Sequence, residues 1–193
     1  MLNVRTNMKG RGLVKAQILD AWSECMATDY ASQRINSERS LQASMWAKLN
    51  DRLGKNRRLF IEPRMTVREG NRVKAVFPDL VVCNSRQVIS IIELKYLPRA
   101  KPNYKKDIYT LNLIAGNRAG VSIANERFQG PQADSTQYSL SKSILFVWAG
   151  VHAAANDCKD QLFSEGRENL TGCYLQLHAA THKSRGPDVY HYE

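Results

Sequence analysis

Three ionisable residues interrupt two strongly apolar stretches in the middle of the sequence. Asp79 precedes the run LVVC, and Glu93 and Lys95 lie within VISIIELKY. Successive side chains of a strand point to opposite sides of a sheet, and both sides are apolar here, so we expect both to be covered. A sheet covered on both sides excludes ionised groups unless they are paired or bind a metal. These three residues are therefore the first candidates for chemistry.

The connection between the two apolar strands decides how the acids meet. Residues 84–87 contain no Asn-Gly or Gly-Gly pair, so a two-residue turn is not indicated and a three-residue loop fits equally well. If residues 85–87 form that loop, Asn84 faces Val88, and Asp79 lies directly opposite Glu93. One face of the hairpin then carries the three ionisable residues with Val81, Cys83, Ile89 and Ile91, and the other carries Leu80, Val82, Ile92 and Leu94.

In this register the Cβ atoms of the two acids are about 5 Å apart. Their carboxylates repel each other at neutral pH unless a positive group lies between them, and a divalent cation bound by both is the simplest solution. Such an ion lowers the pKa of a bound water and neutralises charge on a phosphate, as phosphodiester hydrolysis requires. Lys95 is expected to be cationic beside Asp79 and Glu93, and to orient the water or stabilise the developing anion.

The sequence Pro78-Asp79, followed by Glu93-Leu94-Lys95 on the next strand and then by a helix, resembles the PD-(D/E)XK nuclease superfamily. That family includes restriction enzymes, junction resolvases and repair or phage nucleases. Its core is a small mixed sheet flanked by helices in the order α-β-β-β-α-β, and the elements that we expect over residues 37–151 follow this order. The resemblance covers about half of the chain and implies a restriction-endonuclease-like α/β fold, Mg²⁺ as cofactor with Mn²⁺ able to replace it, and endonuclease activity on DNA.

The same resemblance implies further metal ligands. The backbone carbonyl of Leu94 is one, and a glutamate on the helix before the strands is another, for which Glu38 is the matching position. Glu38 shares the inward face of its helix with Leu41 and Met45. A purely structural role is open to Glu38 as well, because an acid in the first turn of a helix interacts favourably with the helix dipole. Glu62, on the first strand, is the competing fourth acid.

Two functions of other kinds remain open. The chain could be a basic DNA-binding module without catalysis, in which Glu93 and Lys95 form a structural ion pair, or an assembly subunit of a larger nuclease complex. A lone ion pair does not account for Asp79 or for the apolar flanks. The intact set of Asp79, Glu93 and Lys95 favours the enzyme.

The periodicity of apolar residues gives the elements that must position these groups. Helices are predicted over residues 12–30 and from Ser37, a candidate N-cap, to a stop at Gly54, with inward positions at Leu41, Met45, Leu49 and Leu53. Strands are predicted as a three-strand meander over residues 59–67, 73–83 and 88–96, with a turn at 69–71. A helix over 104–115, a loop over 117–141, a strand over 143–151, a helix over 157–169 and a strand over 173–179 follow. We expect one nuclease-like domain with its core at 37–151, to which the first helix and the C-terminal strand region are added.

Basic residues dominate the charge of the chain. Its 28 Lys and Arg against 18 Asp and Glu give a formal net charge of +10, which favours a polyanionic partner such as DNA. Two basic runs flank the acidic residues in sequence: residues 48–74, with nine basic against three acidic side chains, and residues 99–106. The residues expected to contact DNA phosphates are Arg64, Arg68, Arg99, Lys101, Lys105 and Lys106.

Other patterns are weaker or exclude a function. His178 and His182 have the spacing of a metal pair, but no acid completes such a motif, so we interpret them as structural or surface residues. No phosphate-binding GxxxxGK[ST] motif is present, which argues against a nucleotide cofactor. Apolar runs of spanning length and a secretory leader are absent, and Cys25, Cys83, Cys158 and Cys173 are widely spaced, so we expect a cytoplasmic protein with reduced thiols and no membrane partner. Cleavage of both DNA strands by a chain with one site favours a homodimer.

The second basic run generates a direct prediction. Replacing Lys101, Lys105 and Lys106 by Gln is expected to weaken duplex DNA binding and to flatten its dependence on salt, by about 0.9 in the slope of log K against log salt for each phosphate that the protein no longer neutralises. Fluorescence anisotropy titrations at several salt concentrations measure this. A slope equal to that of the wild type would place the DNA path elsewhere, and sequence preference is expected to be unchanged, because phosphate contacts do not read bases.

Overall fold

The computed structural model describes residues 10–101, 104–124, 137–154 and 168–193 of the chain. Over these residues it has three α-helices: α1 (Arg11–Glu24), α2 (Glu38–Asn50) and α3 (Lys105–Gly116). The strands are β1 (Arg58–Ile61), β2 (Met65–Glu69), β3 (Arg72–Val76), β4 (Leu80–Cys83), β5 (Gln87–Leu97), β6 (Val121–Ala124), β7 (Gln137–Ala153), β8 (Tyr174–Thr181) and β9 (Asp188–Tyr192). They form a nine-stranded mixed sheet.

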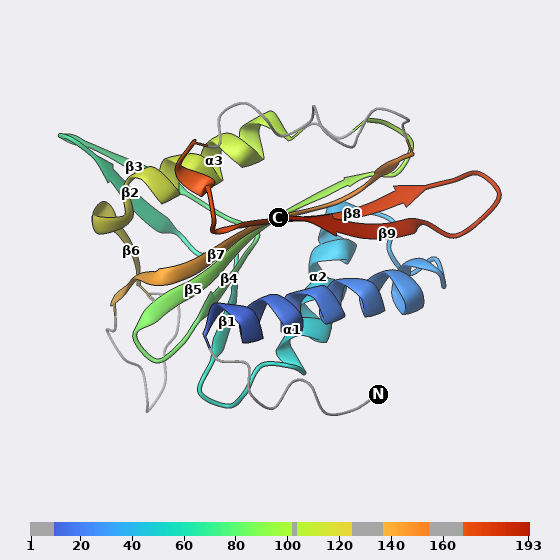
Figure 1. Ribbon diagram of the computed structural model, residues 1–193, viewed down its shortest axis with the longest axis horizontal. Helices are drawn as coiled ribbons and strands as arrows, with labels where there is room; N and C mark the ends of the chain where they lie inside the picture. The colour runs from blue at the N-terminus through green and yellow to red at the C-terminus, as the bar shows by residue number, and fades with distance from the viewer. Residues whose placement is uncertain (1–9, 102–103, 125–136, 155–167) are drawn as a thin grey trace.

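Helices cover both faces of this sheet, so the protein is a mixed α/β structure in layers (Figure 1). The long strand β7 is the centre of the arrangement. Its C-terminal half runs parallel to β5 on one side and to β8 on the other, while its N-terminal residues pair with β6, which leads on to β2 and β3. Strands β4 and β1 extend the sheet beyond β5, and β9 extends it beyond β8.

Two apolar cores lie on the two faces. One is formed between the sheet and α3, around Phe146, Trp148 and Ile114, and the other between the sheet and α1 with α2, around Trp22, Leu41 and Val147. The covering of both faces, expected from the apolar flanks of the acidic residues, is confirmed. Within the described residues, no helix has the length and apolar character needed to cross a membrane.

The first two helices begin close to where the sequence predicts. The side chain of Ser37 accepts from the backbone N–H of Ser40, and the hydroxyl of Ser40 accepts from the backbone N–H of Ser37, so the predicted N-cap of α2 is confirmed as part of a capping box. The helix stops at Asn50, a few residues before the predicted stop at Gly54. Helix α1 continues into a π-helix (Cys25–Tyr30), so the predicted first helix is present.

The predicted three-strand meander is wrong in its first two members. Residues 59–67 divide into β1 and β2 at Glu62, whose φ is 43°, and Pro63, and residues 73–83 divide into β3 and β4 around Pro78. Proline cannot donate to a strand ladder, and a left-handed residue turns the chain, so each run breaks there. In the β2–β3 hairpin, β2 pairs with β6, which comes much later in the sequence. Strand β1 pairs directly with β4.

The β4–β5 hairpin reaches the predicted register by a different route. Its turn spans residues 84–87, where the N–H of Asn84 donates to the carbonyl of Gln87, and Cys83 rather than Asn84 pairs with Val88. A β-bulge at Ile89 then shifts the pairing by one residue, so that Val82 pairs with Ser90 and Leu80 with Ile92. From there on the register is the predicted one. The bulge also moves Ile89 to the α1–α2 face, so its predicted place on the face of the acids is wrong.

The remaining elements agree in part with the prediction. The predicted 104–115 helix is α3, and the last predicted strand is β8. The predicted loop over 117–141 contains strand β6 and the start of β7, and most of the predicted 157–169 helix lies outside the described residues, although a short 3-10 helix (Glu168–Leu170) occupies its end. Strand β9 was not predicted, because its pattern alternates between half-buried and exposed residues and includes polar side chains on both faces.

Close packing at Gly150 fixes the indole of Trp148 over the sheet, and it gives a stability prediction. A Cβ atom at Gly150 would overlap Cη2 of the fully buried Trp148 ring, so the ring must move. Gly150→Ala is expected to lower the free energy of unfolding by about 1–3 kcal/mol, as overpacking does.

The matched control is Gly54→Ala, where no atom lies within 4 Å of the added Cβ. That variant is expected to be as stable as the wild type or slightly more stable, because alanine restricts the unfolded chain. Chemical denaturation of the three proteins measures the difference. Equal unfolding midpoints for the two variants would contradict the tight packing of Trp148 on Gly150.

Candidate active site

The two predicted acids meet at the point where β4 begins. The pairing of Leu80 with Ile92 places Asp79 beside Glu93, and the nearby Asp79 carboxyl contributes to the raised pKa of Glu93. The backbone N–H of Leu94 donates to Oδ2 of Asp79 over 2.6 Å, which holds the Asp79 carboxyl against β5. The predicted side-by-side placement of the two carboxyl groups is confirmed.

Burial sets the charge state of this pair. Glu93 is only 8% exposed, and burial together with the neighbouring Asp79 raises the pKa of its carboxyl well above the ordinary value. Burial also raises the pKa of Asp79 to about 6, against the opposing effect of the Leu94 N–H. Two full negative charges on this pair are therefore costly in the absence of a cation.

Lys95 extends from the same strand and connects two helices. Its Nζ lies 3.3 Å from Oε2 of Glu38, at the start of α2, and 3.6 Å from Oδ2 of Asp107, in the first turn of α3. Burial lowers the pKa of Lys95, but the carboxylates of Asp107 and Glu38 outweigh burial and the pKa is raised overall. The ammonium group is therefore cationic and is held from both sides of the sheet.

The structure distinguishes the two candidates for a fourth acid. Besides its contact with Lys95, the Glu38 carboxylate accepts from the backbone N–H of Tyr96 over 3.2 Å, so it is fixed to β5. Glu62 is exposed, and its side chain accepts from Gln42 Nε2. The backbone N–H of Glu62 donates to the carbonyl of Asp79. Glu38 thus belongs to the charged cluster, whereas Glu62 contacts the backbone beside it.

Asp107 and Gln42 were missed by the sequence reasoning. Asp107 is buried, and its Oδ2 accepts from Nε1 of Trp148 over 3.3 Å as well as pairing with Lys95. A signal for it was present, because Asp107 precedes Leu111 by four residues and Ile114 by seven, on the inward face of α3. Gln42 is buried in α2 and donates to the Asp79 carbonyl over 3.2 Å.

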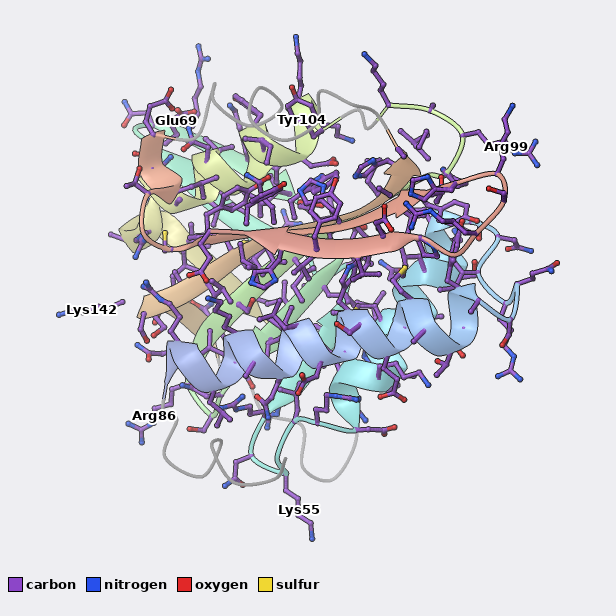
Figure 2. All side chains as sticks on the ribbon, turned by 45° about the vertical axis from the view of Figure 1, so that its right-hand side comes forward. Lys55, Glu69, Arg86, Arg99, Tyr104 and Lys142 are labelled. Atoms are coloured by element: carbon purple, nitrogen blue, oxygen red, sulfur yellow. The ribbon has the colours of Figure 1, made fainter. Side chains whose placement is uncertain are left out.

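The fold brings some of the six basic residues predicted to contact DNA close to the acids, and leaves others apart from them. Lys105 and Lys106 are exposed in the first turn of α3, directly before Asp107, and Lys101 and Arg99 follow the end of β5 (Figure 2 shows Arg99 extending from the surface). Arg64 is exposed between β1 and β2. Arg68 lies on β2, which is separated from β5 by β6 and β7 in the sheet order, so it is not brought to the cluster.

The histidines are engaged elsewhere on the sheet. His178 is buried, its ring stacks on Tyr190, and its Nδ1 lies 3.0 Å from Nε2 of His152. Burial lowers the pKa of His178 to about 3, so this ring is neutral. His182 Nε2 lies 2.8 Å from the Asp188 carboxylate. The two histidines thus have different partners.

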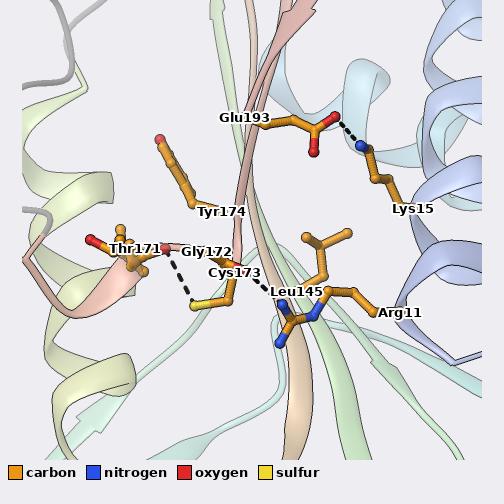
Figure 3. A pocket seen from close by; sticks show the side chains of 9 residues that line it. Arg11, Lys15, Leu145, Thr171, Gly172, Cys173, Tyr174 and Glu193 are labelled. Carbon is orange, nitrogen blue, oxygen red and sulfur yellow. Dashed lines mark hydrogen bonds and ion pairs between the residues drawn. The ribbon is translucent and has the colours of Figure 1, made fainter.

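A cavity of about 250 Å³ lies between α1 and the start of β8, away from the predicted site residues (Figure 3). Arg11 reaches from α1 and donates to the backbone carbonyls of Ser143 and Gly172, and Lys15 pairs with Glu193. The basic groups of this cavity are therefore engaged by the protein itself, and they join α1 to the strands.

Oxygen donors in the cluster suit a hard cation. Within the part of the chain that the structure describes, no three His, Cys, Asp or Glu side chains form a ready cage for a metal ion. Lys95 explains this in part, because it takes up the carboxylates of Glu38 and Asp107. Mg²⁺, however, needs only one or two carboxylates and completes its shell with waters and substrate phosphates. The buried pair of Asp79 and Glu93 fits that requirement.

Comparisons with known proteins assign no family to the chain. No model of a protein family matches it, and neither does any curated protein or any solved structure. The expected resemblance to PD-(D/E)XK nucleases therefore rests on the sequence motif alone.

The raised pKa values generate a prediction for stability against pH. Between the ordinary pKa of 3.8 and the folded value of about 6, the folded protein holds a proton on Asp79 that the unfolded chain has lost. This group therefore stabilises the fold fully below pH 3.8, and that contribution is lost as the pH rises through about 6. In metal-free buffer, Asp79→Asn is expected to flatten this part of the stability profile, and its melting temperature at pH 7 is expected to equal or exceed that of the wild type.

Asp188→Asn is a control of opposite sign. Hydrogen bonds from Arg185 and His182 lower the pKa of Asp188, so its stabilising contribution is complete above pH 3.8 and is lost as the pH falls below that value. Between pH 4 and 8 the variant is therefore expected to lower stability by a nearly constant amount and to leave the slope of the profile unchanged. Thermal melts from pH 4 to 8 in EDTA make the comparison. A large loss of stability in Asp79→Asn at pH 7 would mean that Asp79 serves a structural ion pair.

Proposed function

We propose that this protein is a Mg²⁺-dependent nuclease that hydrolyses phosphodiester bonds in DNA, with a restriction-endonuclease-like core. The observation that supports the proposal most is the placement of Asp79 beside the buried Glu93, with the cationic Lys95 on the same strand as Glu93. The order of elements adds support, since helix α2, the neighbouring strands β1, β4 and β5, helix α3 and the parallel strand β7 follow the expected α-β-β-β-α-β path once the β2–β3 hairpin and its partner strand β6 are set aside.

Asp79 and Glu93 are the residues that would hold the ion. A bound Mg²⁺ supplies Lewis-acid chemistry, which activates water and neutralises charge on the phosphate. The protein keeps the carboxyl groups of Asp79 and Glu93 side by side, where their negative charges repel each other. A bound cation would remove this repulsion. Leu94 fixes one of them through its N–H, and the Leu94 carbonyl stays a predicted ligand from the resemblance.

Lys95 acts as a fixed positive group. Glu38 and Asp107 hold its ammonium from opposite layers and keep it charged, so it suits stabilising a developing anion or orienting water rather than accepting a proton. Asp107 is a positioning residue in this scheme, because it acts through Lys95. The indole N–H of Trp148 in turn orients Asp107.

The second candidate is the non-catalytic DNA-binding module. The contacts of Lys95 with both Glu38 and Asp107 favour it, because such a network also ties α2 and α3 to the sheet. It does not account for the contact between Asp79 and Glu93, which destabilises the metal-free fold at neutral pH. The enzyme is therefore the better supported function, and the assembly-subunit role has no separate observation in its favour.

Substitutions at Asp79 and Lys95 separate the two proposed roles. Asp79→Asn keeps the shape but removes the charge that would hold Mg²⁺, so it is expected to reduce both cleavage and Mg²⁺ affinity. Lys95→Ala is expected to reduce cleavage with Mg²⁺ still bound, and a loss of about a hundredfold or more is typical for a charged group that stabilises the reacting centre. Cleavage of supercoiled, linear, branched and single-stranded DNA, with and without Mg²⁺, and calorimetric Mg²⁺ titration measure these effects.

Matched controls are Glu69→Gln, an exposed acid at the end of β2, and Lys142→Ala, an exposed lysine on β7. Both are expected to cleave at the wild-type rate. DNA binding is expected to survive in all four variants. Undiminished cleavage by Asp79→Asn, or an absence of Mg²⁺-dependent cleavage by the wild type on every substrate, would favour the non-catalytic module.

A further inference from the structure

A second hollow lies next to the candidate active site, at the carboxyl ends of the parallel strands. It has a volume of about 740 Å³, and the described residues that line it are Tyr30, Tyr96, Pro98, Arg99, Ala153, Ala154, Thr181, His182 and Lys183. These residues come from the end of the first helical segment and from the ends of β5, β7 and β8. Clefts at this edge of a sheet with parallel strands are common places for ligands.

Tyr96 joins the hollow to the catalytic cluster. It follows Lys95 directly, and its backbone N–H donates to the same Glu38 oxygen that contacts the Lys95 ammonium. The wall of the hollow and the proposed catalytic lysine are thus fixed by one carboxylate. A molecule bound in the hollow lies beside the reacting centre.

Two phenol rings form one wall. Tyr30 and Tyr96 are half-buried, and burial raises the pKa of each, with a further contribution to Tyr30 from the neighbouring Tyr96 phenol. The hydroxyl of Tyr96 donates to the carbonyl of Ile35 over 3.0 Å, which holds that ring in place. The Tyr96 ring is therefore a fixed aromatic surface, and the half-buried Tyr30 ring packs against the same apolar core.

The charge of the hollow is positive. Arg99 and Lys183 are exposed, and none of the described lining residues is acidic. His182 also lines it, but the Asp188 carboxylate engages its ring. Basic groups beside aromatic rings are the combination that binds single strands, because the phosphates meet the cations and the bases stack on the rings.

The frame of the hollow is rigid. The hydroxyl of Thr181 donates to the carbonyl of Pro98 over 2.5 Å, and the carbonyl of His152 lies 3.1 Å from the same oxygen as an alternative acceptor. The backbone N–H of Ala153 donates to the carbonyl of Ala100, and the backbone N–H of Ala154 donates to the carbonyl of Thr181. These bonds tie the segment after β5 to the ends of β7 and β8, so the hollow is preformed and is large enough for a nucleotide.

We infer that this hollow binds an unpaired stretch of nucleic acid, with a base stacked on Tyr30 and Tyr96 and the backbone phosphates near Arg99 and Lys183. A duplex cannot use the rings in this way, because its bases are stacked on one another. The inference deepens the proposed nuclease function, on which its biological meaning rests, by naming single strands, flaps or frayed ends as the substrate class.

Binding is measured in EDTA, so that cleavage plays no part. The probe is a fluorescently labelled twelve-residue oligo(dT), compared with a blunt duplex in anisotropy titrations. Tyr30→Leu is expected to weaken oligo(dT) binding by roughly tenfold or more without changing the salt slope, since stacking is worth about 1–3 kcal/mol per base. Tyr30→Phe keeps the ring and is expected to bind like the wild type.

The charge arm uses the double variant Arg99→Gln/Lys183→Gln, which is expected to lower the single-strand salt slope by about 0.7 for each phosphate contact. Its control is Arg86→Gln/Lys142→Gln, which removes two exposed charges from the opposite side of the molecule (Figure 2). Melting curves confirm that each variant is folded. Equal losses in the two double variants, or wild-type affinity in Tyr30→Leu, would overturn the inference.

The outcomes distinguish this inference from the proposed function. Oligo(dT) binding that depends on Tyr30, in a protein that cleaves nothing, supports the hollow and counts against the nuclease. Cleavage that depends on Asp79, with equal binding of oligo(dT) by the wild type and Tyr30→Leu, supports the nuclease and refutes the hollow. Tighter binding of the blunt duplex than of oligo(dT), with both affected equally by Tyr30→Leu, also refutes it.

Discussion

Confinement of two carboxyl groups side by side in a covered sheet is the constraint on which the site depends. Burial makes a full negative charge on either Asp79 or Glu93 costly, and their proximity makes two such charges more costly still. The backbone N–H of Leu94 donates to the Asp79 carboxyl and offsets part of this cost. A pair in this condition is receptive to a cation, because binding one replaces an electrostatic penalty with an attraction.

The lysine beside this pair depends on a further series of contacts. Lys95 is held by Glu38 from one layer and by Asp107 from the other, so its position requires that both helices pack correctly on the sheet. Asp107 is buried and its carboxylate is held by the indole of Trp148, which lies against Gly150 on the same strand. Apolar packing of a central strand therefore determines where the ammonium of Lys95 can lie, which is how rigid elements make a site precise.

The sequence predicted the meeting of Asp79 and Glu93 better than the path of the chain. Ionisable residues in apolar strands are conspicuous, so Asp79 and Glu93 could be found and their meeting foreseen. Asp107 was missed because an acid in the first turn of a helix has an ordinary explanation in the helix dipole. The break at Glu62 and the pairing of the β2–β3 hairpin with β6 depend on contacts between residues far apart in sequence, which periodicity does not contain. Helices with clear caps and a clear apolar stripe were predicted to within a few residues.

The bulge at Ile89 has a consequence for how this protein can change in evolution. The turn pairs Cys83 with Val88, and on that count alone Asp79 would face Ile92, which would place Glu93 on the other side of the sheet. The extra residue at the bulge returns Asp79 and Glu93 to the same face of the sheet. A lineage could therefore lengthen the turn by one residue if it lost the bulge at the same time, whereas any lone insertion or deletion in this hairpin separates the two acids. Keeping the two acids together thus requires a fixed number of residues between them as well as the right side chains.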